Sequence, residues 1–122
     1  MNFLREKLGV HVTGYSPIGA GGFSYKQDSV KTLNLLEEPA IVSLSSKYGK
    51  TPAQIVLNWH IQHRGHIVIP KTTKKDRLGE NLLSYNFKLS DEDYSSIDAL
   101  ANGARFFNPI GWAGYLNAPL FD

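Results

Sequence analysis

The feature that most restricts the fold of this chain is a short apolar run that stops at a proline and leads straight into a cationic helix start. Ile67-Val68-Ile69 has the β-branched character of a buried strand, and Pro70 ends it. Thr73 and Asp76 form a capping-box pattern, which predicts a helix that starts there and continues to about residue 84. A strand that leads directly into a helix is typical of α/β folds with parallel strands.

A second β-branched run, at residues 10–15, predicts another strand, and the Ser16-Pro17 turn ends it. Between the two runs lie a helix predicted over residues 39–48 and a second helix that begins at the Thr51-Pro52-Ala53-Gln54 capping box and ends at Gly65. Strands joined through helices pair in parallel. Two such strands cannot cover both faces of their sheet, so we expect the chain to be part of something larger.

The remaining segments predict one helix before the first strand and one helix near the C-terminal end of the chain. Residues 2–8 are predicted to be the end of a helix that stops at Gly9. Ser90 is predicted to cap a last helix whose buried face holds Tyr94, Ile97 and Leu100. Residues 103–122 are rich in Gly, Pro, Asn and aromatic residues, which predicts a tail or loop. At 122 residues the chain is one domain at most.

Composition excludes several classes of function. The net charge of +2, from 13 basic and 11 acidic residues, is too small to indicate a nucleic-acid or anionic-membrane partner. The absence of cysteine excludes disulfides, thiolate metal sites and cysteine nucleophiles. No apolar stretch approaches the roughly 18 residues that span a bilayer. The amphipathic N-terminus carries an acid and does not have the character of a secretory signal, so we expect a cytoplasmic location.

The cationic turn after the second strand predicts a phosphate site. Lys71 lies where the strand ends, Thr72 and Thr73 offer hydroxyl groups, and Arg77 lies one helical turn further on. The free N–H groups and the dipole of the helix start also favour an anion. Glu80 and Asn81 follow on the same face and suit the amino edge of a purine. The alternative interpretation is a solvated basic helix start with no ligand.

Two other groups of residues invite weaker hypotheses. His60, His63 and His66 suggest zinc, although no carboxylate or cysteine is near them in the sequence, and a plain solvated helix end is the alternative. Lys71, Lys74, Lys75 and Arg77 suggest nucleic-acid binding, but Asp76 lies among them and no aromatic platform accompanies them. We therefore predict neither a metal nor a nucleic acid as ligand.

Several segments of the chain resemble the aldo-keto reductases, in the same order and spacing. Those that carry the resemblance are Tyr15-Ser16-Pro17-Ile18-Gly19, the run from Thr51 to Trp59, and Ile69-Pro70-Lys71-Thr72 with Arg77, Glu80 and Asn81. Asn86 to Ser90 and the final Pro119 to Asp122 are similar too, and have the character of aldose and xylose reductases.

The resemblance implies an α/β fold that is the C-terminal part of a (β/α)8 TIM barrel. Residues 1–122 would then be a single partial domain with strand 7 at about 10–15, strand 8 at about 66–70, and a C-terminal tail at 103–122. Phosphate sites in such barrels are often built from the loops after strands 7 and 8. The catalytic Asp, Tyr, Lys and His of the family lie on earlier strands, so we expect no catalytic residue in this chain.

The resemblance also assigns the binding residues for the cofactor, NADP(H). Lys71, Thr72 and Arg77 would hold the adenosine 2′-phosphate, and Thr73 and Ile69 belong to the same segment. Glu80 and Asn81 would contact adenine. The ring of Tyr15 would stack on the nicotinamide, and Ser16, Pro17, Ile18 and Gly19 would lie near the pyrophosphate. Trp112 resembles part of the family's variable substrate-pocket loop, with packing under the barrel mouth as the alternative.

The implied activity of the intact parent is NADPH-dependent reduction of an aldehyde or ketone to an alcohol. This chain would supply the cofactor-binding portion and would be inactive alone, and a small-molecule carbonyl compound would be the substrate of the intact enzyme. The alternative is a non-catalytic half-barrel module whose strand edges pair with a second copy or with a missing N-terminal half.

Overall fold

The computed structural model describes residues 2–19 and 34–101. The predicted tail at 103–122, with Trp112, lies outside the described residues. In chain order the elements are α1 (Asn2–Leu8), β1 (Thr13–Tyr15), the 3-10 turn η1 (Leu35–Glu37), α2 (Pro39–Tyr48), α3 (Pro52–Asn58), the π-helical turn η2 (Trp59–His63), β2 (Ile67–Ile69), α4 (Lys75–Leu82), the 3-10 turn η3 (Leu83–Tyr85) and α5 (Asp91–Asp98).

The two strands pair in parallel, as the sequence predicts. Thr13 lies opposite Ile67 and Tyr15 opposite Ile69, so the carboxyl ends of both strands meet at one edge of the sheet. Each strand is only three residues long and lies inside the longer range expected for it. One face of this sheet is bare, because the side chains of Tyr15, Ile67 and Ile69 are more than half exposed.

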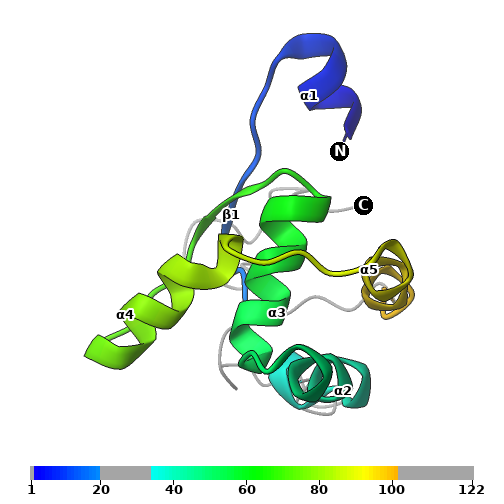
Figure 1. The fold of residues 1–122 in the computed structure, drawn as a ribbon. Coiled ribbons are helices and arrows are strands. Elements are labelled where there is room, and N and C mark those ends of the chain that lie inside the picture. The colour runs from blue at the N-terminus through cyan, green and yellow to red at the C-terminus, as the bar shows by residue number, and fades with distance from the viewer. Residues whose placement is uncertain (1, 20–33, 102–122) are drawn as a thin grey trace, which may run out of the picture.

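The apolar core lies between helices and not under the sheet. Helices α2, α3 and α5 surround it, and α3 runs through the centre of the view in Figure 1 with α2 and α5 to one side. The buried residues of this core are Ile41, Leu44, Ile55, Val56, Leu89, Tyr94 and Ile97. Helix α1 stands apart at one end of the molecule, joined to β1 by an extended stretch (Figure 1).

The starts and ends of α2, α3 and α5 follow local signals. The Thr51 hydroxyl oxygen accepts from the N–H of Gln54, and the Gln54 side-chain oxygen accepts from the N–H of Thr51, which confirms the capping box. Gly49 ends α2 in the left-handed region at φ 60°, where glycine has no steric cost. The Ser90 hydroxyl caps α5 through the N–H of Asp93. Among the described residues, no helix is long and apolar enough to cross a membrane.

Helix α4 differs from the sequence prediction at its start. The predicted Thr73–Asp76 capping box was wrong, because the helix begins at Lys75 and no side chain caps it at Lys74. The Thr72 hydroxyl oxygen instead accepts from the N–H of Lys74 at 3.1 Å, and this bond accompanies an extended backbone at Lys74.

The apolar stripe predicted on α4 is not covered in this chain. Leu78 and Leu82 are 59% and 68% exposed, and α4 buries no side chain among the described residues.

Candidate functional site

The turn after β1, at residues 16–19, holds four of the predicted site residues in a tight conformation. Ser16 adopts a left-handed φ of 49°, which is uncommon for a residue other than glycine, and its carbonyl accepts from the N–H of Gly19 at 3.0 Å. Pro17 is buried, and Ile18 packs against the helical core. Backbone strain of this kind persists only where the surrounding contacts hold it, so the turn has a defined shape.

A pair of histidines fixes this turn to the helical layer. Nε2 of His60 lies 3.0 Å from the carbonyl oxygen of Pro17, and Nδ1 of His60 lies 3.1 Å from Nδ1 of His66. A carbonyl only accepts, so the His60 proton must be on Nε2, and His66 must donate from Nδ1. Burial, with the neighbouring His66 as second cause, lowers the pKa of His60 to about 4, so the pair is neutral at pH 7.

A cavity of about 520 Å³ opens beside the end of β1. Its walls come from the β1 turn, η1, the end of α3 with η2, and α5 with the residues after it. The lining residues are Gly14, Tyr15, Ser16, Pro17, Gly19, Leu35, Val56, Trp59, His60, Arg64, Ile97, Asp98, Leu100 and Ala101. The cavity therefore joins four predicted cofactor residues to side chains of the helical layer, and the sequence predicted no role for two of these, Arg64 and Asp98.

Asp98 is the polar centre of that second set. Its carboxylate accepts from Nε1 of Trp59 at 2.8 Å, from Nε2 of His63 at 3.0 Å and from the Arg64 guanidinium at 2.7 Å. Burial raises the pKa of Asp98, but the bonds from His63 and Trp59 and the charge of Arg64 together outweigh it, and the net shift is downward. These donors lie 34 to 39 positions from Asp98 in the chain, so no local pattern could have found them.

The same contacts show how the three histidines lie relative to one another. His60 and His66 bond to each other, whereas His63 bonds to Asp98 and stacks on the ring of Tyr94 at 4.9 Å between centroids. A carboxylate is thus close to His63 in space, although none is near it in the sequence. Within the described part of the chain, no group of three or more possible metal ligands converges.

The other predicted residues follow β2 and form a cationic surface. Lys71, Lys74, Lys75 and Arg77 are all exposed, and none of their side chains makes a hydrogen bond or ion pair with the rest of residues 2–19 and 34–101. Asp76 is the acid among them. We call the four cations the α4 cationic surface. Unpaired cations beside the free N–H groups of an eight-residue helix suit a phosphate group.

Glu80 and Asn81 lie one turn further along α4 and are half-buried. Ile69 ends β2 and is exposed on the bare face of the sheet, opposite Tyr15. The two groups of predicted residues thus leave neighbouring strands at the same edge of the sheet. No residue from Lys71 to Asn81 lines the cavity. The residues of the β1 turn and those that follow β2 therefore form two separate surfaces at the same edge of the sheet.

Comparison with known proteins places this arrangement in a family. A model of the Aldo/keto reductase family matches residues 1–102 of the chain. The chain belongs to this family. The resemblance carried by the short motifs thus extends over most of the chain.

Relatives of this aldo/keto reductase chain are about three times its length. A protein of Arthroderma otae named "Probable NAD(P)H-dependent D-xylose reductase xyl1" is 43% identical over 115 residues, which cover 93% of this chain and 34% of the relative. Aldo-keto reductase family 1 member A1-A of Danio rerio is 39% identical over 98 residues, covering 80% of this chain and 29% of the relative.

A solved structure shows the same fold. The crystal structure of an aldo-keto reductase of the silkworm, Bombyx mori, superposes with a TM-score of 0.73 at 36% identity. The match covers 97% of this chain and 35% of the silkworm chain. The fold is therefore that of a fragment of the family's TIM barrel.

Proposed function

We propose that this chain carries the NADPH-binding portion of an aldo-keto reductase, corresponding to strands 7 and 8 of the barrel and the C-terminal loop. The α4 cationic surface supports this most directly, because four exposed cations lie at a helix start with no partner among the described residues. The parallel strand pair that precedes it, with one bare face, is what an open piece of a barrel presents.

In this proposal, different residues contact different parts of the cofactor. Arg77 and Lys71 pair with the adenosine 2′-phosphate, which also gives NADPH its preference over NADH. The Thr72 hydroxyl already accepts from Lys74, so its own proton is free to donate to the phosphate. Glu80 and Asn81 contact adenine. Tyr15 stacks on the nicotinamide, and the Ser16–Gly19 turn lies along the pyrophosphate.

The parent reaction in this proposal is reduction of an aldehyde or ketone to an alcohol in the cytoplasm. Bound NADPH supplies the hydride, and a tyrosine supplies the proton. None of the residues of this chain is assigned as that proton donor or as one of its partners. Loss of general-acid catalysis costs about 10²–10⁴ in rate, so we expect the 122-residue chain alone to have no measurable turnover.

The test is a calorimetric titration of the chain with NADP⁺ and with NAD⁺. We expect binding of NADP⁺ and much weaker binding of NAD⁺. Arg77→Ala should weaken NADP⁺ binding by about tenfold or more, since it removes a charge-assisted contact. Lys88→Ala is the matched control, because Lys88 is an exposed cation away from α4 and should not matter. Equal affinity of Arg77→Ala and the parent would refute the 2′-phosphate assignment.

The second candidate is an assembly module without cofactor binding. The exposed apolar side chains favour it: Leu78, Leu82, Leu83 and Tyr85 around the end of α4, and Tyr15, Ile67 and Ile69 on the sheet. Sedimentation equilibrium of the parent and of the Leu82→Glu variant tests this. Concentration-dependent association that Leu82→Glu abolishes, with no heat from NADP⁺, would favour the assembly module over the reductase fragment.

A further inference from the structure

Helix α4 carries most of the proposed adenosine contacts, yet it buries no side chain of its own. Its position therefore depends on polar contacts rather than on apolar packing. The structure shows where these come from. Three amide side chains spaced four residues apart on α3 and η2 each donate to a backbone carbonyl of the α4–η3 segment: Gln54, Asn58 and Gln62.

The three contacts differ in what they hold. Gln54 Nε2 donates to the carbonyl of Glu80 at 3.0 Å, inside α4. Asn58 Nδ2 donates to the carbonyls of Ser84 and Phe87 at 2.8 and 2.7 Å, beyond the end of α4. Gln62 Nε2 donates to the carbonyl of Tyr85 at 2.9 Å, on the exposed side. Among these three amides, Gln54 alone reaches α4 itself.

Gln54 is also held rigidly at its other end. Its Oε1 accepts from the N–H of Thr51 at 3.0 Å in the capping box, and the side chain is only 7% exposed. The amide thus bridges the start of α3 and the backbone of Glu80, with both of its polar ends in use. Few rotamers satisfy both bonds, so the amide fixes the distance between the two helices.

We propose that Gln54 is a positioning residue for the adenosine end of the cofactor, and that it acts through the Glu80 carbonyl to set the place of α4. The inference rests on the proposed function, because it concerns the same Arg77, Glu80 and Asn81 surface. Gln54 itself touches no cofactor in this scheme. It orients the helix from which these side chains project.

Gln54→Glu is the decisive variant. Glutamate keeps the oxygen that accepts from Thr51, since Glu and Gln serve equally in a capping box, but it removes the donor to Glu80. At about pH 8 we expect NADP⁺ to bind about tenfold more weakly than to the parent. When the carboxyl regains a proton as the pH is lowered toward about 6, it can donate to the Glu80 carbonyl again, so affinity relative to the parent should recover.

Gln62→Glu is the matched control, because it makes the same charge change in the donor that holds Tyr85. It should leave NADP⁺ affinity close to that of the parent at both pH values. Amide hydrogen exchange supplies the second measurement: Gln54→Glu should speed exchange in α4 at about pH 8 and leave α2 unchanged.

The outcomes separate the two proposals. If the parent chain shows no heat with NADP⁺, the proposed function fails and this inference fails with it. If the parent binds and Gln54→Glu binds equally well at both pH values, the positioning role is wrong while the proposed function stands. Equal weakening in Gln54→Glu and Gln62→Glu, with no recovery at about pH 6, would indicate a general loss of structure and would also overturn the role of Gln54.

Discussion

The Nδ1 atoms of His60 and His66 lie 3.1 Å apart, and the carbonyl of Pro17 occupies the other nitrogen of His60. One proton is shared between the two facing nitrogens, so a second proton would leave two donors facing each other. The charged Arg64 nearby opposes that second proton as well, and the pKa of His66 is lowered by burial and then by Arg64. This contact joins β1, η2 and the start of β2.

The first prediction concerns acid stability. The pKa of His60 is about 4 in the folded chain against 6.5 in the unfolded chain, so the unfolded state binds more protons between these values. The contribution of neutral His60 to the free energy of unfolding is fully present above pH 6.5 and is lost as the pH falls toward 4. The midpoint temperature of thermal unfolding should therefore decrease when the pH is lowered from 7 to 5, and it should decrease less in His60→Gln than in the parent. His11→Gln, at an exposed position, is the control and should show the same pH dependence as the parent. If the unfolding temperature of His60→Gln changed with pH as steeply as that of the parent, the mechanism would be contradicted.

The second prediction concerns Asn58, which is completely buried and makes three hydrogen bonds. Its amide donates to the Ser84 and Phe87 carbonyls and accepts from the Tyr94 hydroxyl at 2.8 Å. Asn58→Ala removes the donor to the Ser84 and Phe87 carbonyls and the acceptor of the Tyr94 hydroxyl, which keeps only the bond that it accepts from the N–H of Leu89. It should lower the free energy of unfolding by about 3–5 kcal/mol in urea denaturation. Asn86→Ala, at an exposed position, should change it by less than about 0.5 kcal/mol.

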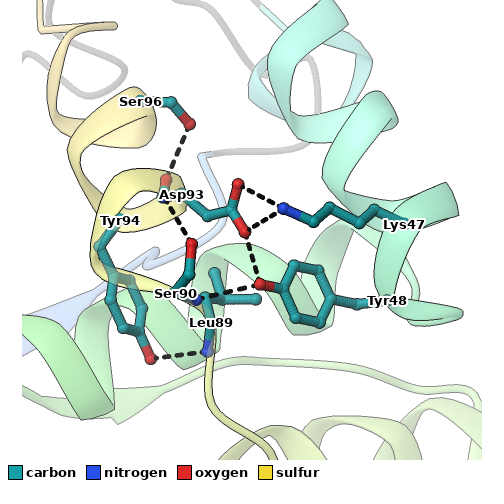
Figure 2. A network of polar contacts seen from close by, with 7 residues as sticks. All are labelled: Lys47, Tyr48, Leu89, Ser90, Asp93, Tyr94 and Ser96. Atoms are coloured by element: carbon teal, nitrogen blue, oxygen red, sulfur yellow. Dashed lines mark hydrogen bonds and ion pairs between the residues drawn. The ribbon is translucent and has the colours of Figure 1, made fainter.

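The third prediction concerns the network between α2 and α5 in Figure 2. Asp93 accepts from Lys47 at 2.7 Å and from the Tyr48 hydroxyl, which in turn accepts from the N–H of Ser90. The hydrogen bond from Lys47, and after it the bond from Tyr48, lowers the pKa of Asp93. The stability that the charged Asp93 contributes to the folded chain is therefore present above pH 3.8 and is lost as the pH falls below that value.

Asp93→Asn tests this network. It should cost about 1 kcal/mol at pH 7, because Lys47 is more than half exposed and the Tyr48 bond persists in weaker form. Urea denaturation at pH 7 and again near pH 3 is the measurement. We expect the difference from the parent to shrink at the lower pH. A difference that stays constant would show that the charge of Asp93 contributes nothing.

The fourth prediction concerns the Asp98 cluster beside the cavity. Asp98→Asn keeps the shape but removes the charge that Arg64 and His63 face. We expect a loss of about 1–2 kcal/mol in the free energy of unfolding, with the Trp59 fluorescence shifted because its indole N–H loses a charged acceptor. Asp76→Asn, at an exposed position on α4, is the control and should leave the fluorescence unchanged.

Much of the local structure could be predicted from short patterns. The caps at Thr51 and Ser90 and the stop at Gly49 each depend on hydrogen bonds or dihedral angles within a few residues, so the sequence determined them directly. The parallel pairing of the strands followed from the helices between them. The start of α4 differs from the prediction because the Thr72 hydroxyl accepts from the N–H of Lys74, whose backbone is extended, and the helix begins only at Lys75.

The sequence by itself therefore determined the order of the strands and helices, the caps at Thr51 and Ser90, and the cationic surface that follows β2. Only the tertiary structure decided that Asp98 joins Trp59, His63 and Arg64, and that Gln54 and Asn58 hold the α4–η3 backbone. It also decided that Leu78 and Leu82 stay exposed. The physical reason is distance along the chain: these contacts join residues 26 to 39 positions apart, and their existence depends on how whole helices pack.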